Sequence, residues 1–144
     1  MYQNYNPNPY IPTGKQHIFG DCVVRAICAA TGKGWFEVYD MLCKKGRQIG
    51  DFGNSRQVYP LVLEELGFES SGVKRKKGEK ALTVRDFCES HKEGIYILKL
   101  AHHLTCIKDG ICYDTWFPQK KTIYRIYRKD RIKRWIQLSI SFEE

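Results

Sequence analysis

The residue whose surroundings most favour chemistry is Cys22, which directly follows Asp21 at the predicted start of a helix. A thiol becomes a strong nucleophile only as a thiolate, which the unpaired amides and positive dipole end of a helix N-terminus stabilise. Asp21 is expected to cap this helix. Cys28 and Cys43 fall inside predicted helices and gain less from the effect. We therefore expect Cys22 to be a nucleophile, although a buried structural cysteine is also common at a helix start.

A β-hairpin later in the chain supplies an imidazole and a carboxylate. Asp109-Gly110 is a strong signal for a two-residue turn, which would pair Lys108 with Ile111. In that register His103 and Asp114 are diagonal neighbours on one face of the hairpin, with Cβ atoms roughly 6–8 Å apart. A carboxylate can hydrogen-bond to an imidazole across this span. We therefore expect His103 to act as the base and Asp114 to orient it.

Nearby residues complete the expected site. Trp116 shares a face with His103 and would shield it from water, which strengthens hydrogen bonds by lowering the local dielectric constant. Gln16 lies six positions before the nucleophile, where its amide could help the nucleophile's own N–H stabilise a tetrahedral oxyanion. Trp116 and Asp21 are also expected to contact the substrate. His102 points to the opposite face of the hairpin and is the poorer candidate for the base.

The order of these residues resembles that of the papain superfamily of cysteine peptidases. In that superfamily a Gln-x5-Cys motif opens a helix, and a strand His and then a strand with Asn/Asp–Ser–Trp follow much later. This chain has Gln16, Cys22, His103 and Asp114-Thr115-Trp116. The Gln…Asp-Cys opening and the compact length are closer to the bacteriocin-processing peptidases of ABC exporters. The chain also resembles small proteins encoded by phages and mobile elements of Firmicutes over most of its length. Those proteins carry runs similar to GDCVVRAICAATGKGWFEVY and HLTCIKDGICYDTW.

This resemblance implies a papain-like fold and a mechanism. The Cys22 thiolate would attack a carbonyl, the His103 imidazolium would protonate the leaving group, and Asp114 would fix the imidazole tautomer. Gln16 and the amide of the nucleophile would form the oxyanion hole. The expected function is a cysteine peptidase or a related thiol acyl-transfer enzyme that acts on a protein or peptide. The similarity to phage proteins implies a host protein as its target.

The distribution of positive charge supports an alternative function. The net charge is +8, and two segments carry the excess: residues 73–80 hold five Lys or Arg, and residues 120–134 hold eight. Aromatic and arginine side chains interleave in the second segment, a pattern that could stack bases and hold phosphates. The alternative is a catalytically silent papain-fold module that binds nucleic acid or an acidic partner. A solvated loop and the outer face of a strand pair explain both segments equally well. The candidate contacts are Lys74, Arg75, Lys76, Lys77, Arg125, Arg128, Arg131 and Arg134.

Hydrophobic periodicity predicts helices first and strands afterwards. This order indicates the α+β class, with N-terminal helices packed on a C-terminal antiparallel β-sheet. Thr83 and Asp86 resemble a capping box at the start of the last helix. Helices are expected from Cys22 to just before Gly32 and at roughly 34–45, 55–66 and 84–91, with residues 68–80 as a polar, basic connection. Strands are expected at 95–101, 103–108, 111–116, 122–128 and 135–142.

The length of 144 residues fits one compact domain. We place it at residues 15–144, after an extended N-terminal arm of residues 1–14 that is rich in Asn, Tyr and Pro. The six cysteines are expected to be reduced and mostly buried, because no secretory signal is present and a domain of this size needs no disulfide. Without a Cys-x-x-Cys pair, no metal or other cofactor is expected. No apolar run is long enough to span a bilayer, which predicts a cytoplasmic protein without a membrane partner.

Overall fold

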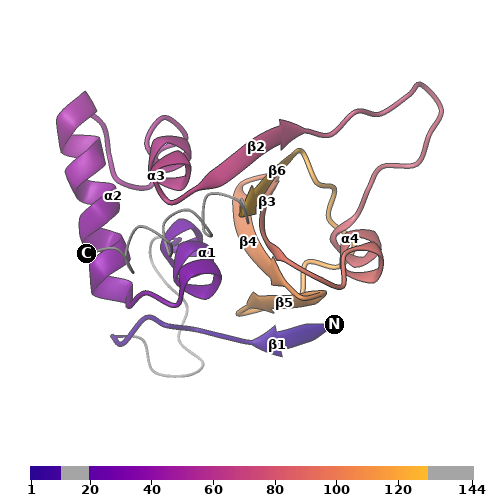
Figure 1. The fold of residues 1–144 in the computed structure, drawn as a ribbon, viewed down its shortest axis with the longest axis horizontal. Coiled ribbons are helices and arrows are strands. Elements are labelled where there is room, and N and C mark those ends of the chain that lie inside the picture. Colours follow the sequence, from indigo (N-terminus) through magenta and orange to yellow (C-terminus); the bar gives the residue numbers. More distant parts are fainter. Residues whose placement is uncertain (11–19, 130–144) are drawn as a thin grey trace, which may run out of the picture.

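The computed structural model describes residues 1–10 and 20–129 of the chain. Within these residues the protein has four helices and a six-stranded β-sheet, which confirms the α+β class (Figure 1). The helices are α1 (Cys22–Thr31), α2 (Trp35–Ile49), α3 (Tyr59–Glu65) and α4 (Val84–Ser90). The strands are β1 (Tyr2–Asn4), β2 (Phe68–Gly72), β3 (Ile95–Leu100), β4 (His103–Lys108), β5 (Ile111–Asp114) and β6 (Arg125–Lys129). The strand predicted at 135–142 and the predicted boundary after residue 14 lie outside the described residues.

The strands of the sheet follow the order β1-β5-β4-β3-β6-β2. Neighbouring strands are antiparallel except β1 and β5, which are parallel, so the prediction of an antiparallel sheet is wrong at this edge. The start of the N-terminal arm forms β1, in which Tyr2 lies opposite Cys112. The Tyr2 ring stacks on Phe117 with centroids 5.4 Å apart, and Tyr5 packs edge-on against Tyr113. Aromatic contacts and backbone pairing together hold this polar segment on the sheet.

The β4–β5 hairpin has the predicted register. Lys108 pairs with Ile111, and the two turn residues, Asp109 and Gly110, have φ angles of 52° and 77°. Positive φ at both central positions is typical of the tight turn whose twist matches that of the flanking strands. β5 ends earlier than predicted, so Trp116 lies just beyond the strand.

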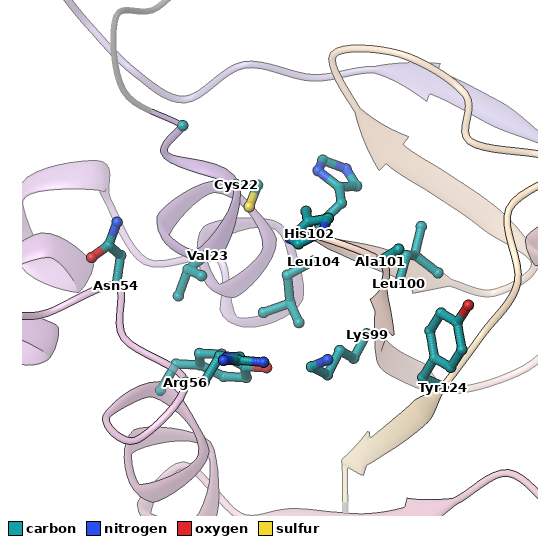
Figure 2. Close-up of a pocket in the computed structure, with 13 residues that line it drawn as sticks. Cys22, Val23, Asn54, Arg56, Lys99, Leu100, Ala101, His102, Leu104 and Tyr124 are labelled. Carbon is teal, nitrogen blue, oxygen red and sulfur yellow. The ribbon is translucent and has the colours of Figure 1, made fainter.

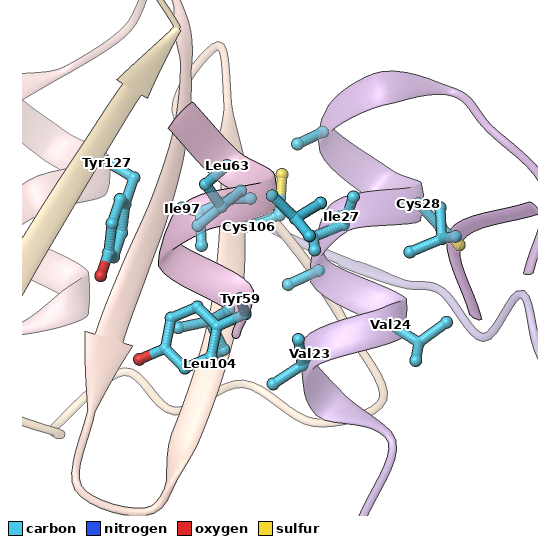
Figure 3. Packing of buried hydrophobic residues seen from close by; sticks show 14 of the residues in the cluster. Val23, Val24, Ile27, Cys28, Tyr59, Leu63, Ile97, Leu104, Cys106 and Tyr127 are labelled. Atoms are coloured by element: carbon cyan, nitrogen blue, oxygen red, sulfur yellow. The ribbon is translucent and has the colours of Figure 1, made fainter. Parts of the chain in front are cut away.

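Helix α1 lies between α2 and the sheet (Figure 1), and nearly all of its residues are buried. Figure 3 shows Val23 and Ile27 of α1 in the cluster that also contains Tyr59 of α3 and Leu104 of β4. Burying a large apolar side chain of this kind contributes about 1.5–3 kcal/mol to stability. The helix ends as predicted at Gly32, whose left-handed φ of 75° suits glycine. This packing holds the N-terminus of α1 firmly against β4.

Helix α4 covers the opposite face of the sheet. A second apolar cluster lies beneath it and includes Phe87, Leu98 and Ile107. The predicted capping box is confirmed: Thr83 Oγ1 accepts a hydrogen bond from the Asp86 amide, and the Asp86 carboxylate accepts one from the Thr83 amide.

Several element boundaries differ from the prediction. Residues 68–80 are not only a connection, because Phe68–Gly72 form β2 and pair with β6. Phe68 is buried and the next four residues are exposed, so no alternation of apolar residues marks this strand. Helix α3 begins at Tyr59, after a turn in which the Ser55 carbonyl accepts a hydrogen bond from the Val58 amide. Helix α2 continues to Ile49 and β6 begins only at Arg125.

Candidate active site

Cys22 is the first residue of α1, and its sulfur faces the start of β4 (Figure 2). The His103 imidazole and the backbone amide of Leu104 are close enough to the thiol to lower its pKa. Amides in the first turn of a helix also lack acceptors within the helix, and they carry the positive end of its dipole. The sulfur therefore lies among groups that stabilise a thiolate.

His103 connects this thiol to a carboxylate. Its Nε2 lies 2.7 Å from Oδ2 of Asp114, which leaves Nδ1 as the ring nitrogen available to the thiol. The indole ring of Trp116 lies 5.1 Å from the imidazole ring, measured between centroids. Trp116 is 42% exposed, so it covers the imidazole on one side while it still contacts solvent. Cys22, His103 and Asp114 thus lie in series, with a hydrogen bond between His103 and Asp114 and with the imidazole acting on the thiol.

Asp114 is only 3% exposed and is surrounded by donors. Thr105 Oγ1 donates to Oδ2 over 2.7 Å, and the Thr115 amide donates to Oδ1 over the same distance. Arg25 places Nη2 3.6 Å from Oδ1. A buried carboxylate stays ionised only when donors and cations compensate for its lost hydration. This surrounding shell makes Asp114 a fixed anionic acceptor for His103.

The pKa values of the three groups shift in the directions that favour an ion pair. Burial raises the pKa of Cys22, but the hydrogen bonds from His103 and Leu104 and the charges of His103 and Arg25 outweigh it and lower that pKa below the ordinary 9.0. Burial lowers the pKa of His103, yet its hydrogen bonds to Asp114 and Cys22 raise it to about 9. Burial likewise raises the pKa of Asp114, and the bond to His103 makes the net shift downward. Thiolate and imidazolium are therefore favoured over the neutral pair.

Asp21 takes the N-cap position of α1 as predicted, but the expected side-chain capping hydrogen bond is absent. Its carboxylate instead accepts hydrogen bonds from Arg25, from Nδ2 of Asn8 at 3.0 Å and from Nε1 of Trp35 at 3.1 Å. Donors from the N-terminal arm, from α1 and from α2 thus bind this carboxylate.

Arg25 is a member of the site that the sequence pattern does not identify. Its side chain is 9% exposed and lies between the carboxylates of Asp21 and Asp114, with which it forms ion pairs. Its Nε is buried without a hydrogen-bond partner. A buried guanidinium between two carboxylates balances their charge and links the first turn of α1 to the end of β5. Its position at i+4 from Asp21 is the one sequence signal that could have revealed half of this bridge.

The thiol opens onto a cleft of about 610 Å³ (Figure 2). Neither Asp21 nor Trp116, the residues predicted to contact a substrate, is among its lining residues. Gln16, the predicted oxyanion donor, lies outside the described residues. The cleft is lined by Gly20, Cys22, Val23, Asn54, Arg56, Tyr59, Lys99, Leu100, Ala101, His102, His103, Leu104 and Tyr124.

The other cysteines have different environments. All six cysteines are free, and four of them are buried. Burial raises the pKa of Cys28 to about 11 and that of Cys112 to about 12, and it also raises the pKa values of Cys88 and Cys106. Cys43 is exposed on α2. Among the cysteines with a shifted pKa, only Cys22 shifts downward.

The predicted nucleic-acid contacts fall into three groups. Residues 74–77 are exposed in the connection between β2 and α4. On β6, Arg125 donates to Ser70 Oγ over 2.7 Å, and Arg128 lies 3.4 Å from a Glu69 carboxylate oxygen, so both contact β2. Arg131 and Arg134 lie outside the described residues. The side chains of Arg125 and Arg128 therefore link β6 to β2.

Among residues 1–10 and 20–129, no three His, Cys, Asp or Glu side chains form a group that could hold a metal ion. None of the helices in that part of the chain combines the length and the apolar character needed to cross a bilayer. Comparisons of this chain with protein-family models, with curated proteins and with solved structures found no match. Functional inference therefore depends on the geometry of the site and on the order of its residues.

Proposed function

We propose that this protein is a thiol-dependent hydrolase or acyl-transfer enzyme of the papain-like type. The observation that carries the proposal is the series Cys22, His103 and Asp114, in which His103 hydrogen-bonds to Asp114 and its imidazole lowers the pKa of the thiol. The thiol also lies at a helix start and beside an open cleft. A nucleophile, a base within hydrogen-bond reach and a third group that orients the base are the parts that covalent acyl transfer requires. A papain-like fold is the finer part of this proposal, supported by the sequence order of the three residues.

The first half of the reaction forms an acyl-enzyme. The Cys22 thiolate attacks the carbonyl carbon of an amide, and the carbonyl oxygen becomes an oxyanion. The His103 imidazolium gives its Nδ1 proton to the leaving nitrogen, the C–N bond breaks, and the amine departs from a thioester on Cys22. Asp114 accepts the hydrogen bond from Nε2 throughout, which fixes the orientation of the ring and stabilises its positive charge.

The second half releases the acyl group. Neutral His103 takes a proton from water as the water attacks the thioester, and the thiolate of Cys22 leaves. If an amine replaces water as the nucleophile, the same steps transfer the acyl group to that amine. The amide of Cys22 and its neighbours at the start of α1 are oriented to donate to the oxyanion, a contribution typically worth about 3 kcal/mol per donor. Gln16 remains the proposed second donor.

The proposal is tested by comparing cysteines in one alkylation experiment. Limiting iodoacetamide at pH 7, followed by peptide mass spectrometry, gives a rate for each thiol. Cys43 is the matched comparison because it is exposed, whereas the buried cysteines are slow for lack of access. We expect Cys22 to react faster than Cys43, because the lowered pKa of Cys22 increases the fraction of its thiol present as thiolate.

A second step tests turnover. The protein is incubated with a mixture of peptide thioesters, and intact mass is measured for the wild type, for Cys22→Ala and for the control Cys112→Ala. A peptidyl adduct on the wild type and on Cys112→Ala, but not on Cys22→Ala, supports the acyl-enzyme. Labelling of Cys22 no faster than Cys43, with no adduct, contradicts the proposed function.

The basic segments support a second candidate function, a nucleic-acid-binding module. The side chains of residues 74–77 are exposed in the described structure, which is what phosphate contacts require. Arg128 forms an ion pair with Glu69. This weakens the candidate function, because the carboxylate offsets the positive charge that would attract a phosphate. Oligonucleotide binding that falls steeply with salt and is unchanged by Cys22→Ala would favour the module over the enzyme.

A further inference from the structure

Among the described residues, the cleft beside Cys22 is lined by cations and by no carboxylate. Arg56 enters it from the turn before α3, Lys99 enters it from β3, and none of the described lining residues is Asp or Glu. Figure 2 shows the two cationic side chains on opposite sides of the space. His102 and the partner of the thiol, His103, also line the cleft. A concave surface with one sign of charge concentrates ligands of the opposite sign.

The strand register places another cation beside Lys99. Lys99 on β3 lies directly opposite Arg125 on β6, and paired residues of antiparallel strands share a face. Like charges in such a pair repel each other. Within the described residues neither Lys99 nor Arg56 forms an ion pair, and Arg125 donates to the neutral hydroxyl of Ser70. The positive charges of these three residues are therefore not compensated by an ion pair within the described residues.

A neighbouring groove fixes where an anion would bind. This groove of about 670 Å³ shares Arg56, Tyr59 and Lys99 with the cleft, so the two are continuous. Its far part is also lined by Glu64 and Glu69, which offset the positive charge there. The uncompensated positive potential is thus strongest where the two hollows join, between Arg56 and Lys99.

This junction belongs to the same cleft as the nucleophile. Lys99 pairs with Leu104 across the β3–β4 ladder, and the Leu104 amide is one of the groups that lower the pKa of Cys22. Adjacent strands lie about 4.8 Å apart, and a lysine side chain can cover that span. A carboxylate held by Lys99 and Arg56 would therefore belong to a residue at or next to the carbonyl that Cys22 attacks.

We propose that the cleft selects acidic peptide substrates, with Arg56 and Lys99 as specificity-determining residues that bind an Asp or Glu side chain next to the reacting carbonyl. This inference rests on the proposed function, because it assigns the substrate class of the same thiol. The cations would lower the free energy of the complex through charge-assisted hydrogen bonds. Arg56 and Lys99 are distinct from the catalytic series Cys22, His103 and Asp114.

The test uses paired peptide acyloxymethyl ketones that react with thiols. Within each pair one probe carries Glu and the other carries Gln, and all other residues are alanine. One pair has the Glu or Gln at the first position before the reactive carbon, and the other pair has it at the second. Rates of Cys22 modification are measured on the wild type, on Arg56→Gln/Lys99→Gln, and on Lys76→Gln/Lys77→Gln. The last variant removes the same charge from an exposed loop and is the matched control.

We expect the wild type and the control to prefer the Glu probe at one of the two positions by about tenfold, which is typical for one or two charge-assisted contacts. The Arg56→Gln/Lys99→Gln variant should lose this preference, so that the Glu and Gln probes modify its Cys22 at equal rates. Fast iodoacetamide labelling of Cys22 with equal rates for Glu and Gln probes overturns the acidic-substrate inference but leaves the proposed function intact. Protection of Cys22 by inorganic phosphate or an oligonucleotide, without a preference for Glu, overturns it in favour of a phosphate ligand.

Discussion

Two cysteines lie near Asp114, and the same carboxylate affects them in opposite ways. Cys22 reaches Asp114 through His103, and the pKa of its thiol is lowered. Cys112 lies on the same strand as Asp114 and hydrogen-bonds to Thr105, and burial followed by the negative charge of Asp114 raises the pKa of its thiol to about 12. The difference is the His103 imidazole. It places a positive charge next to the thiol of Cys22, whereas the thiol of Cys112 has the negative charge of Asp114 nearby.

The two regions around these thiols differ in the same way. Cys112 belongs to the apolar cluster under α4, where burial and the charge of Asp114 outweigh the groups that would lower its pKa. Cys22 lies at the edge of the other cluster, where Arg25 and His103 bring positive charge close to the sulfur. Burial alone produces an inert thiol, and burial together with a paired imidazole produces a nucleophile. Charge placement, more than exposure, separates the two regions.

The largest effect on this contrast is expected from removing the buried cation. Arg25→Met leaves the carboxylates of Asp21 and Asp114 without their shared partner, so unfolding free energy should fall by about 3–5 kcal/mol. Urea denaturation followed by tryptophan fluorescence measures the change. The control is Arg85→Met, whose ion pair with Glu89 lies at the surface and should contribute at most about 1 kcal/mol. Equal losses for both variants would mean that the bridge between α1 and β5 carries no special role.

Removing the imidazole should make Cys22 resemble an ordinary thiol. In His103→Ala the rate of acyl transfer should fall about 100-fold, which is typical for loss of a general acid–base group. Iodoacetamide labelling at pH 7 should fall as well, because the pKa of Cys22 loses its main downward influence. His102→Ala is the matched control, since His102 lines the cleft but is absent from the groups that shift the pKa of Cys22. Loss of labelling in His102→Ala alone would mean that His102, and not His103, is the base.

A smaller effect is expected from neutralising the carboxylate without changing its shape. In Asp114→Asn the pKa of His103 should drop below its value of about 9, because its hydrogen bond to an anion is lost. The alkaline limb of the pH–rate profile should move to lower pH, and the maximal rate should fall about tenfold, the equivalent of about 1.4 kcal/mol. An unchanged alkaline limb would show that Asp114 does not control the protonation of His103.

The smallest expected effect is on stability as pH changes. The raised pKa of His103 contributes stability below pH 6.5, its ordinary pKa, and this contribution disappears as the pH rises to about 9. The lowered pKa of Asp114 contributes stability above 3.8, which is lost as the pH falls further. The melting temperature of the wild type should therefore decline between pH 6.5 and 9, and that of His103→Gln should decline less. Parallel curves for the two proteins would contradict the coupling.

The sequence predicts those parts of the site that local signals determine. The Asp109-Gly110 turn fixes the register of the hairpin, and this register alone puts His103 and Asp114 on one face. A helix beginning at Cys22 follows from periodicity and from the glycine at its C-terminus. Both features depend on residues that are close together in the chain, where propensity and turn chemistry act directly.

The parts that the sequence does not predict depend on distant partners. Asp21 makes no side-chain capping hydrogen bond because Asn8 and Trp35 bring donors to its carboxylate, and nothing in the local sequence indicates that they meet. In the sequence Arg25 is one of several helical residues, and only the folded sheet places Asp114 beside it. Arg56 and Lys99 come from a turn and a strand that approach each other only in the folded chain.

The boundaries of two strands illustrate the same limit. β1 is polar and β2 has Phe68 as its one buried residue, so neither shows the alternation that marks a half-buried strand. Within residues 1–10 and 20–129 both strands lie at the edges of the sheet, where one neighbour supplies all of the pairing. Their position is set by the exposed backbone groups of β5 and β6, and the parallel direction of β1 could not be read from its own residues.

The most direct measurement of the central claim is the titration of the Cys22 thiol. Ultraviolet thiolate absorbance is recorded against pH for the wild type, Cys22→Ala and His103→Ala, and the difference between wild type and Cys22→Ala isolates the absorbance of Cys22. We expect this difference to titrate clearly below pH 9.0, the ordinary thiol value, and the Cys22 titration to move upward in His103→Ala. A Cys22 thiol that titrates at or above 9.0 in the wild type, and that does not respond to His103→Ala, would contradict the thiolate–imidazolium pair.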